Sequence, residues 1–110
     1  MKIKSLKDYT GGWIVGSFTP ALLKKSDIEV GVKYLKKGFV DDAHYHSNST
    51  EYNVLISGKL SQGKQIITKG DIFIFAPKDI AQVSVLEDAI VLVIRDGCAI
   101  GDKILVEQIL

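Results

Sequence analysis

The sequence predicts an all-β domain, built as a sandwich or a barrel, and two observations carry this prediction. Short runs rich in β-branched and aromatic residues follow one another along the chain, separated by glycine, proline and polar turn signals. Apolar residues almost nowhere recur at the spacing of a helix. Since 110 residues is the length of one domain, we expect a single domain over residues 1–110.

Residues 1–25 are the least regular part of the chain, and we expect them to pack on the barrel as an N-terminal segment. Three glycines interrupt an aromatic and apolar stretch in this segment, and a proline follows. We expect extended structure and turns here, with one turn of helix near residues 21–25. The Gly-Gly-Trp sequence at 11–13 could contact a ligand, but we favour an edge that plugs one end of the core.

Residues 27–35 alternate between apolar and polar positions, as a strand with one buried face does. The apolar face, which we expect to be the buried one, consists of Ile28, Val30, Val32 and Tyr34. The other face consists of Glu29, Gly31 and Lys33.

The rest of the chain predicts further short strands with turns between them. These expected strands cover residues 43–47, 51–57, 59–61, 65–68, 72–75, 83–86, 89–94 and 104–110. Residues 89–94 are apolar throughout, as expected of a strand that is buried on both faces.

The only two histidines of the chain, His44 and His46, lie two residues apart, so in a strand they face the same side. Small polar residues at 47–50 predict a hairpin loop, which would pair His46 with Glu51 and His44 with Asn53. Directly opposed residues have Cβ atoms roughly 4.5–5.5 Å apart, so these side chains would converge on one patch. Two imidazoles and one carboxylate with open coordination positions suit iron, manganese, nickel or zinc.

The spacing of these residues resembles the first motif of the cupin superfamily, G-x5-H-x-H-x4-E-x6-G. Its five fixed positions fall on Gly38, His44, His46, Glu51 and Gly58, over a span of 21 residues. The resemblance implies a small, single-domain, stand-alone cupin with a double-stranded β-helix, or jelly-roll, barrel. It also implies that His44, His46 and Glu51 ligate a divalent transition metal.

The second cupin motif, G-x5-P-x-G-x2-H-x3-N, is degenerate in this chain. Gly70 opens it, but its histidine position falls on Ala81, so the usual fourth protein ligand of the metal is absent. A register slip of one residue would turn Gln82 inward instead. We therefore group Gln82 with Asn53 and with Tyr34, whose strand parity points it inward, as residues that contact a ligand or support the metal ligands.

The charge and the cysteine content exclude several classes of protein. The formal net charge is +1, so no bulk attraction to nucleic acid or to an anionic membrane is expected. The single Cys98 cannot form an internal disulfide, which fits a reducing compartment, and we expect a cytoplasmic protein. No apolar run approaches the ~20 residues of a transmembrane helix, and the first residues lack the apolar run of a secretory signal.

These observations favour a small cupin-type protein that binds a divalent metal and a small-molecule ligand inside the barrel. One alternative is a metal-dependent enzyme of the dioxygenase or isomerase type, since three protein ligands leave open positions on the metal. Another is a metal-free module that binds a sugar or a carboxylate, which Ala81 favours. A relative of the metal-free sugar-nucleotide epimerases ranks last, because the chain lacks the further histidine and the acidic partner that such chemistry would need.

The outer face of the predicted hairpin is apolar, because it carries Tyr45, Tyr52, Val54 and Ile56. A face of this kind is rarely left in water. Either the first 25 residues cover it or a second subunit does, and we expect a homodimer.

Overall fold

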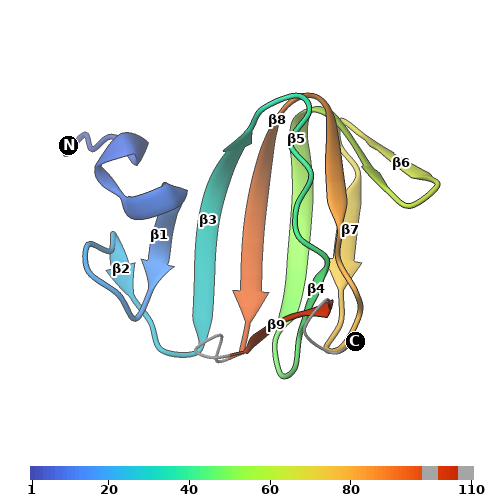
Figure 1. The fold of residues 1–110 in the computed structure, drawn as a ribbon. Coiled ribbons are helices and arrows are strands. Elements are labelled where there is room, and N and C mark those ends of the chain that lie inside the picture. The colour runs from blue at the N-terminus through green and yellow to red at the C-terminus, as the bar shows by residue number, and fades with distance from the viewer. Residues whose placement is uncertain (98–101, 107–110) are drawn as a thin grey trace.

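The computed structural model describes residues 1–97 and 102–106, and strands make up most of this part of the chain (Figure 1). Two 3-10 turns and nine strands are found in the described residues: η1 (Leu6–Asp8), η2 (Thr10–Gly12), β1 (Trp13–Gly16), β2 (Leu23–Lys24), β3 (Ile28–Leu35), β4 (His44–His46), β5 (Thr50–Gln62), β6 (Gln65–Thr68), β7 (Ile72–Phe75), β8 (Val83–Asp96) and β9 (Lys103–Leu105). The all-β class predicted from the sequence is therefore confirmed.

The two longest strands, β5 and β8, form the centre of the main sheet, which has the order β2-β1-β3-β8-β5-β6. β7 pairs with β5 as well, along residues 51–54, whereas β6 pairs with residues 59–62. All of these neighbours are antiparallel except β1 and β2. The predicted strands at 51–57 and 59–61 are thus one strand, and so are those at 83–86 and 89–94.

Each of the two long strands crosses an irregularity near its middle, where Gly58 allows a close approach of the two backbones. The pairing register of β5 with β8 shifts three times between Leu55 and Leu60. Gly58 has a φ of +93°, and a Cβ atom at this position would lie 2.3 Å from the carbonyl oxygen of Asp88. Only glycine fits such a position, because it lacks the Cβ and tolerates positive φ.

A second layer lies in front of the main sheet in Figure 1 and consists of β4, β9 and the chain that precedes β4. β4 and β9 form a separate two-stranded sheet. The bridge His44–Ala81 joins this chain to the segment that leads into β8, and the bridge Val40–Ser84 joins it to the start of β8 itself. The side chains between the two layers form the interior of the barrel.

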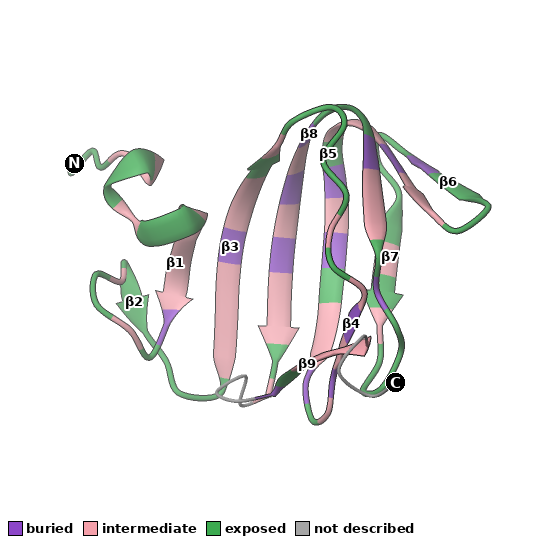
Figure 2. Cartoon of the chain, viewed as in Figure 1, coloured by how far each residue is buried: buried purple, intermediate pink, exposed green. Residues whose placement is uncertain are grey.

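The buried apolar core lies where β5, β6 and β8 turn their inner faces to one another. Its members are Leu55, Leu60, Ile67, Val85, Ala89, Val91 and Val93. Along β8 the buried residues alternate with residues that are partly exposed on the outer face (Figure 2). The apolar run had predicted that residues 89–94 are buried on both faces. This prediction is wrong for the outer face, which is only partly buried.

The face of β3 that points into the barrel is the polar one, so the prediction for this strand is wrong. Lys33 and Leu35 line the interior, and Glu29 forms an ion pair with the inward Arg95. Tyr34, on the apolar face, is 68% exposed. The reason is that the barrel encloses polar groups that pair with one another, so hydrophobicity alone does not mark its inner face.

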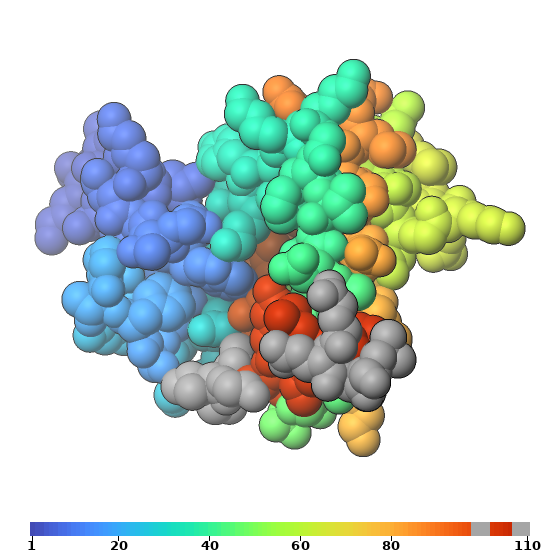
Figure 3. Space-filling view, viewed as in Figure 1, coloured from blue at the N-terminus to red at the C-terminus, as the bar shows by residue number. Residues whose placement is uncertain are grey.

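The N-terminal segment extends the main sheet at the edge of β3, and Figure 3 shows it in blue against that flank. The helical turn predicted at residues 21–25 is wrong, since β2 pairs with β1 there. At the other end of the chain, β9 covers the start of the strand predicted at 104–110, and Cys98 and residues 107–110 lie outside the described residues. No helix in the described ranges has the length and apolar character needed to cross a membrane.

Candidate metal and ligand site

A cavity of about 410 Å³ lies between the two layers and contains the residues of the first motif. Its polar lining consists of Lys33, Asp41, His44, His46, Glu51, Asn53, Arg95 and Lys103. Its apolar lining consists of Trp13, Leu35, Phe39, Leu60, Phe73, Phe75, Ala81, Val83, Val85, Val91 and Val93. A volume of this size is typical of small-molecule sites.

The two histidines and Glu51 converge in this cavity, although the hairpin that we expected to bring them together does not form. β4 pairs with β9, whereas β5 is flanked by β7 and β8. Both histidines are 7% exposed, their ring centroids are 5.4 Å apart, and His46 Nε2 lies 3.8 Å from Glu51 Oε2. The side chains therefore meet across the space between two layers, and the period-two parity of each strand still sets their direction.

Both histidine rings have an oxygen acceptor beside Nδ1. His44 Nδ1 lies 2.8 Å from the carbonyl oxygen of Asp42, which can only accept, so Nδ1 carries the proton and donates. His46 Nδ1 lies 3.3 Å from Oδ2 of Asp102. The hydrogen bond on His44 Nδ1 fixes the tautomer that leaves Nε2 as a lone-pair donor, as is common for metal-ligating histidines, whereas the Asp102 carboxylate lies near His46 Nδ1 without a hydrogen bond.

Asp102 is 1% exposed and binds the loop between β4 and β5. Its carboxylate accepts hydrogen bonds from Ser47 Oγ at 2.7 Å, from the Asn48 amide at 2.6 Å, and from both the amide and the hydroxyl of Ser49. Burial alone would raise the pKa of the Asp102 carboxyl, but the hydrogen bonds from Ser49 and Ser47 outweigh burial and bring the pKa below its usual value of 3.8. Asp102 is therefore an anion that holds the loop and faces His46.

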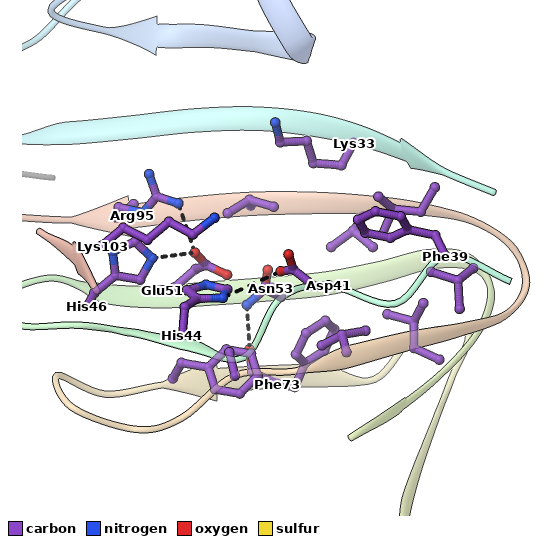
Figure 4. A pocket seen from close by; sticks show the side chains of 18 of the residues that line it. Lys33, Phe39, Asp41, His44, His46, Glu51, Asn53, Phe73, Arg95 and Lys103 are labelled. Carbon is purple, nitrogen blue, oxygen red and sulfur yellow. Dashed lines mark hydrogen bonds and ion pairs between the residues drawn. The ribbon is translucent and has the colours of Figure 1, made fainter. Parts of the chain in front are cut away.

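Arg95 holds Glu51 through an ion pair in the interior of the barrel (Figure 4). Arg95 NH2 donates to Glu51 Oε2 at 3.0 Å, and NH1 donates to Glu29 Oε1 at 3.0 Å. Burial, followed by the charge of Arg95, lowers the pKa of His46 below 6.5 more than Glu51 raises it. His46 is consequently neutral near pH 7, the form in which an imidazole can ligate a metal.

The residues expected to assist the site divide into two groups. Asn53 is 3% exposed, lines the cavity and donates from Nδ2 to the carbonyl oxygen of Phe73 at 3.3 Å. Ala81 also lines the cavity and is paired with His44, so Ala81 and not Gln82 faces the interior. The structure does not bring Gln82 and Tyr34 to the cavity, because both are exposed and neither is among its lining residues.

Sequence reasoning missed Arg95, Asp102 and Lys33, and it placed Trp13 at an edge of the core. A signal existed for Arg95, because it continues the inward parity of Val91 and Val93. No signal existed for Asp102, whose contacts with residues 47–49 span more than fifty positions in the chain.

The donor set fits a divalent ion, although the side chains are not arranged around one. Among residues 1–97 and 102–106, no three histidine, cysteine, aspartate or glutamate side chains are gathered closely enough to hold an ion. Neither ring nitrogen of His46 makes a hydrogen bond within this part of the chain, although both are buried. A buried imidazole without hydrogen bonds is costly, and a metal ion on Nε2 would relieve that cost.

No family model matches the chain, and no curated protein does either. Solved structures do resemble it. An uncharacterized conserved protein with a double-stranded β-helix domain from Klebsiella pneumoniae is 23% identical, with a TM-score of 0.66, over 94% of this chain and 90% of that protein. A sugar phosphate isomerase of the cupin superfamily from Silicibacter pomeroyi is 21% identical, with a TM-score of 0.55, over 64% of this chain and 51% of that protein.

Oxalate decarboxylase from Bacillus subtilis is 18% identical, with a TM-score of 0.63, over 73% of this chain. The present chain spans only about a quarter of that enzyme, since the match covers 24% of its length. These similarities show the fold, which is the cupin-type double-stranded β-helix, or jelly-roll, barrel predicted from the first motif.

Proposed function

We propose that this protein binds a divalent metal ion through His44, His46 and Glu51, and a small-molecule ligand in the same cavity. The observation that carries the proposal is the arrangement of the two imidazoles. Each has an oxygen acceptor beside Nδ1, and Nε2 of the buried His46 is left without a hydrogen bond. Oxalate decarboxylase, a protein with a similar fold, is described with Mn(II) centres.

Glu51 is the residue that must move for the ion to bind, because Arg95 now holds one of its oxygens. A metal bound here would act as a Lewis acid toward a ligand oxygen. Three protein ligands would leave more open positions than the four of a complete cupin set, because Ala81 supplies none. Turnover as a dioxygenase or isomerase is a further step, for which Asn53 and Asp41 are two of the five polar lining residues that bind no metal in this proposal.

The metal test compares two glutamate substitutions. Glu51→Gln should weaken the binding of Mn²⁺ or Zn²⁺ by at least about tenfold in calorimetry, because it removes the charged ligand. Glu87→Gln is the control, since the Glu87 side chain is 60% exposed and pairs only with Lys59 among the described residues. Equal metal affinity in the parent and in Glu51→Gln would show that Glu51 is not a metal ligand. A parent protein that binds neither ion would contradict the metal proposal and favour a metal-free binding module.

We further propose a homodimer formed by the outer face of the main sheet. Two rows of paired residues run across this face. They are Val30, Ile94, Tyr52 and Ile74 in one row, and Val32, Leu92, Val54 and Ile72 in the other. Ile72 is 66% exposed, Ile74 53% and Tyr52 39%, so these rows form an apolar patch of the kind that marks an interface.

Light scattering tests the dimer. We expect a dimer mass for the parent at micromolar concentration and a monomer mass for Ile74→Lys, which puts a charge at the exposed β7 end of the patch. Ile66→Lys is the matched control, because Ile66 is equally apolar and 55% exposed but lies on β6, outside the two rows. A monomer mass for the parent across this range would contradict the proposal.

A further inference from the structure

We propose that the ligand of the cavity is an amphiphilic carboxylate, with its anionic group at Lys33 and Arg95 and its apolar chain toward Phe39. The proposal rests on the proposed function, because it takes the cavity to be a ligand site. It goes further by assigning the ligand a chemical class and an orientation, and it does not require the metal.

The cationic end of the cavity contains three basic side chains from three different strands. Lys33 projects from β3, Arg95 from β8 and Lys103 from β9, and all three line the cavity. Lys33 Nζ lies 4.5 Å from the centre of a Trp13 ring, and the guanidinium carbon of Arg95 lies 4.9 Å from it. Both cations thus lie against the same indole, which brings positive charge together at this end of the cavity.

Arg95 is paired with both Glu29 and Glu51, whereas Lys33 has no ion-pair partner among the described residues. Lys33 Nζ donates to the carbonyl oxygen of Gly11 at 3.0 Å, and no carboxylate of the described residues lies within ion-pair distance of it. Arg95 Nε is buried and makes no hydrogen bond in the same part of the chain. Burial, followed by the charge of Arg95, lowers the pKa of Lys33 more than Glu51 raises it, as expected of a partly buried cation that lacks an ion-pair partner. A carboxylate placed between Lys33 and Arg95 would supply that counter-ion.

The inner faces of three neighbouring strands change from charged to apolar in the same direction. The paired residues Glu29, Arg95 and Glu51 form the first row across β3, β8 and β5. The next inward row is Gly31, Val93 and Asn53, followed by Lys33, Val91 and Leu55, and then by Leu35 and Ala89. Beyond the bend, Leu60 pairs with Val85, whose amide donates to the carbonyl oxygen of Phe39.

The cavity is therefore polar at one end and apolar at the other. Figure 4 shows Arg95, Lys103 and His46 at one end and Phe39 at the far end, with Lys33 between them. A polar metabolite such as a sugar would place its hydroxyl groups against Val85 and Leu60, where no side chain of the lining can bond them. A molecule with one anionic head and an apolar chain satisfies both ends.

The absence of a side chain at Gly31 lets the Trp13 indole lie at the cationic end of the cavity. Trp13 pairs with Gly31, and a Cβ atom at this glycine would lie 2.7 Å from the indole. The indole therefore lies over the Gly31 backbone and faces the cavity. Trp13 is also the only tryptophan of the chain, so its fluorescence reports on this end of the cavity alone.

The experiment titrates the protein with hexanoate and follows the fluorescence of Trp13, with and without a chelator. We expect saturable binding of hexanoate, and binding at least about tenfold weaker for hexanol and hexylamine, which lack the negative charge. Shortening the chain from hexanoate to butanoate should weaken binding about fourfold for each methylene removed. Hexyl phosphate tests the alternative anion, and tighter binding of it than of hexanoate would overturn the assignment to carboxylates.

Substitutions at Lys33 locate the anionic group. Lys33→Met keeps the length of the side chain and removes its charge, so hexanoate binding should weaken about ten- to a hundredfold, whereas Lys33→Arg should keep most of it. Lys64→Met is the matched control, because Lys64 is exposed in the turn between β5 and β6 and should leave binding unchanged. Metal affinity, measured by calorimetry, should be the same in all three variants.

The outcomes separate this inference from the metal proposal. Metal binding without hexanoate binding would overturn the inference alone. Hexanoate binding that depends on Lys33, in a parent protein that binds neither Mn²⁺ nor Zn²⁺, would support the inference and overturn the metal proposal. Equal binding of hexanoate and hexanol would overturn the anionic end, and equal binding of acetate and hexanoate would overturn the apolar end.

Discussion

Gly58 and Gly38 test how much the close backbone approach in the barrel contributes to stability. Their φ angles are nearly equal, but only Gly58 has neighbouring backbone atoms in the place of a Cβ. Gly58 has a φ of +93° and Gly38 a φ of +92°. A Cβ atom at Gly58 would meet the Asp88 carbonyl oxygen at 2.3 Å and the Ala89 Cα at 2.7 Å, whereas a Cβ atom at Gly38 would meet nothing within 4 Å. Alanine at either position therefore costs the same backbone strain, and only Gly58 adds a steric clash.

The magnitudes follow from these two terms. Positive φ costs a residue with a Cβ about 1–2 kcal/mol, and this is the whole cost expected for Gly38→Ala. Gly58→Ala adds about 1–3 kcal/mol for overpacking, because the contacted atoms are backbone and cannot rotate away. For a chain of this length each kcal/mol lowers the melting temperature by about 4 °C. We therefore expect a loss of about 4–8 °C for Gly38→Ala and about 8–20 °C for Gly58→Ala.

Differential scanning calorimetry measures both variants against the parent. Hexanoate binding, followed by Trp13 fluorescence, then shows whether the clash also deforms the cavity. The reasoning is refuted if the two variants lose the same stability, since the backbone approach at Gly58 would then have no measurable cost.

Two further predictions concern the site itself. Ala81→His should raise metal affinity, because Ala81 is buried in the cavity opposite His44, and should cost about 1–3 kcal/mol in stability. Gln82→His, at an exposed position outside the cavity, should leave metal affinity unchanged. Calorimetry measures the metal affinity of both variants. Asp102→Asn should lower stability by about 2–4 kcal/mol, because the Asn48 and Ser49 amides lose an anionic acceptor. Since folding lowers the pKa of Asp102 below 3.8, its stabilisation is complete above that pH and is lost as the pH falls below it; acid unfolding curves of the parent and of Asp102→Asn should converge at low pH, and parallel curves would contradict this role.

The histidine cluster could be predicted from the sequence because parity is a local property of a strand. Residues two apart face the same side whichever strand lies next to them, so His44 and His46 share a face whether β4 pairs with β5 or with β9. The partner of β4 could not be predicted, because residues 103–105 are far away in sequence and carry no register signal. The contact between His46 and Asp102 depends on that partner and was missed for the same reason.

The inner face of β3 was predicted wrongly because both faces of the main sheet are rich in apolar residues. A rule that buries the more apolar face chooses Val30 and Val32, yet it is Lys33 and Leu35 that line the cavity. The clue lay in charge: Glu29, Glu51 and Arg95 are each the charged residue at one end of a strand that is otherwise largely apolar. Three such residues of mixed sign, brought into one row, form ion pairs with one another and can be partly buried together.

The same alternation links the proposed dimer to the proposed site. Every residue of the charged inner row is a sequence neighbour of a residue of the apolar outer row: Val30 follows Glu29, Tyr52 follows Glu51, and Ile94 precedes Arg95. The backbone that positions Glu51 for a metal is thus the backbone that would be packed against a second subunit. A partner on the outer face would restrict the movement of these three strands, and Glu51 would then exchange Arg95 for a metal by side-chain rotation alone. Metal affinity should consequently fall in Ile74→Lys, although Ile74 lies on the opposite face of the sheet from the cavity.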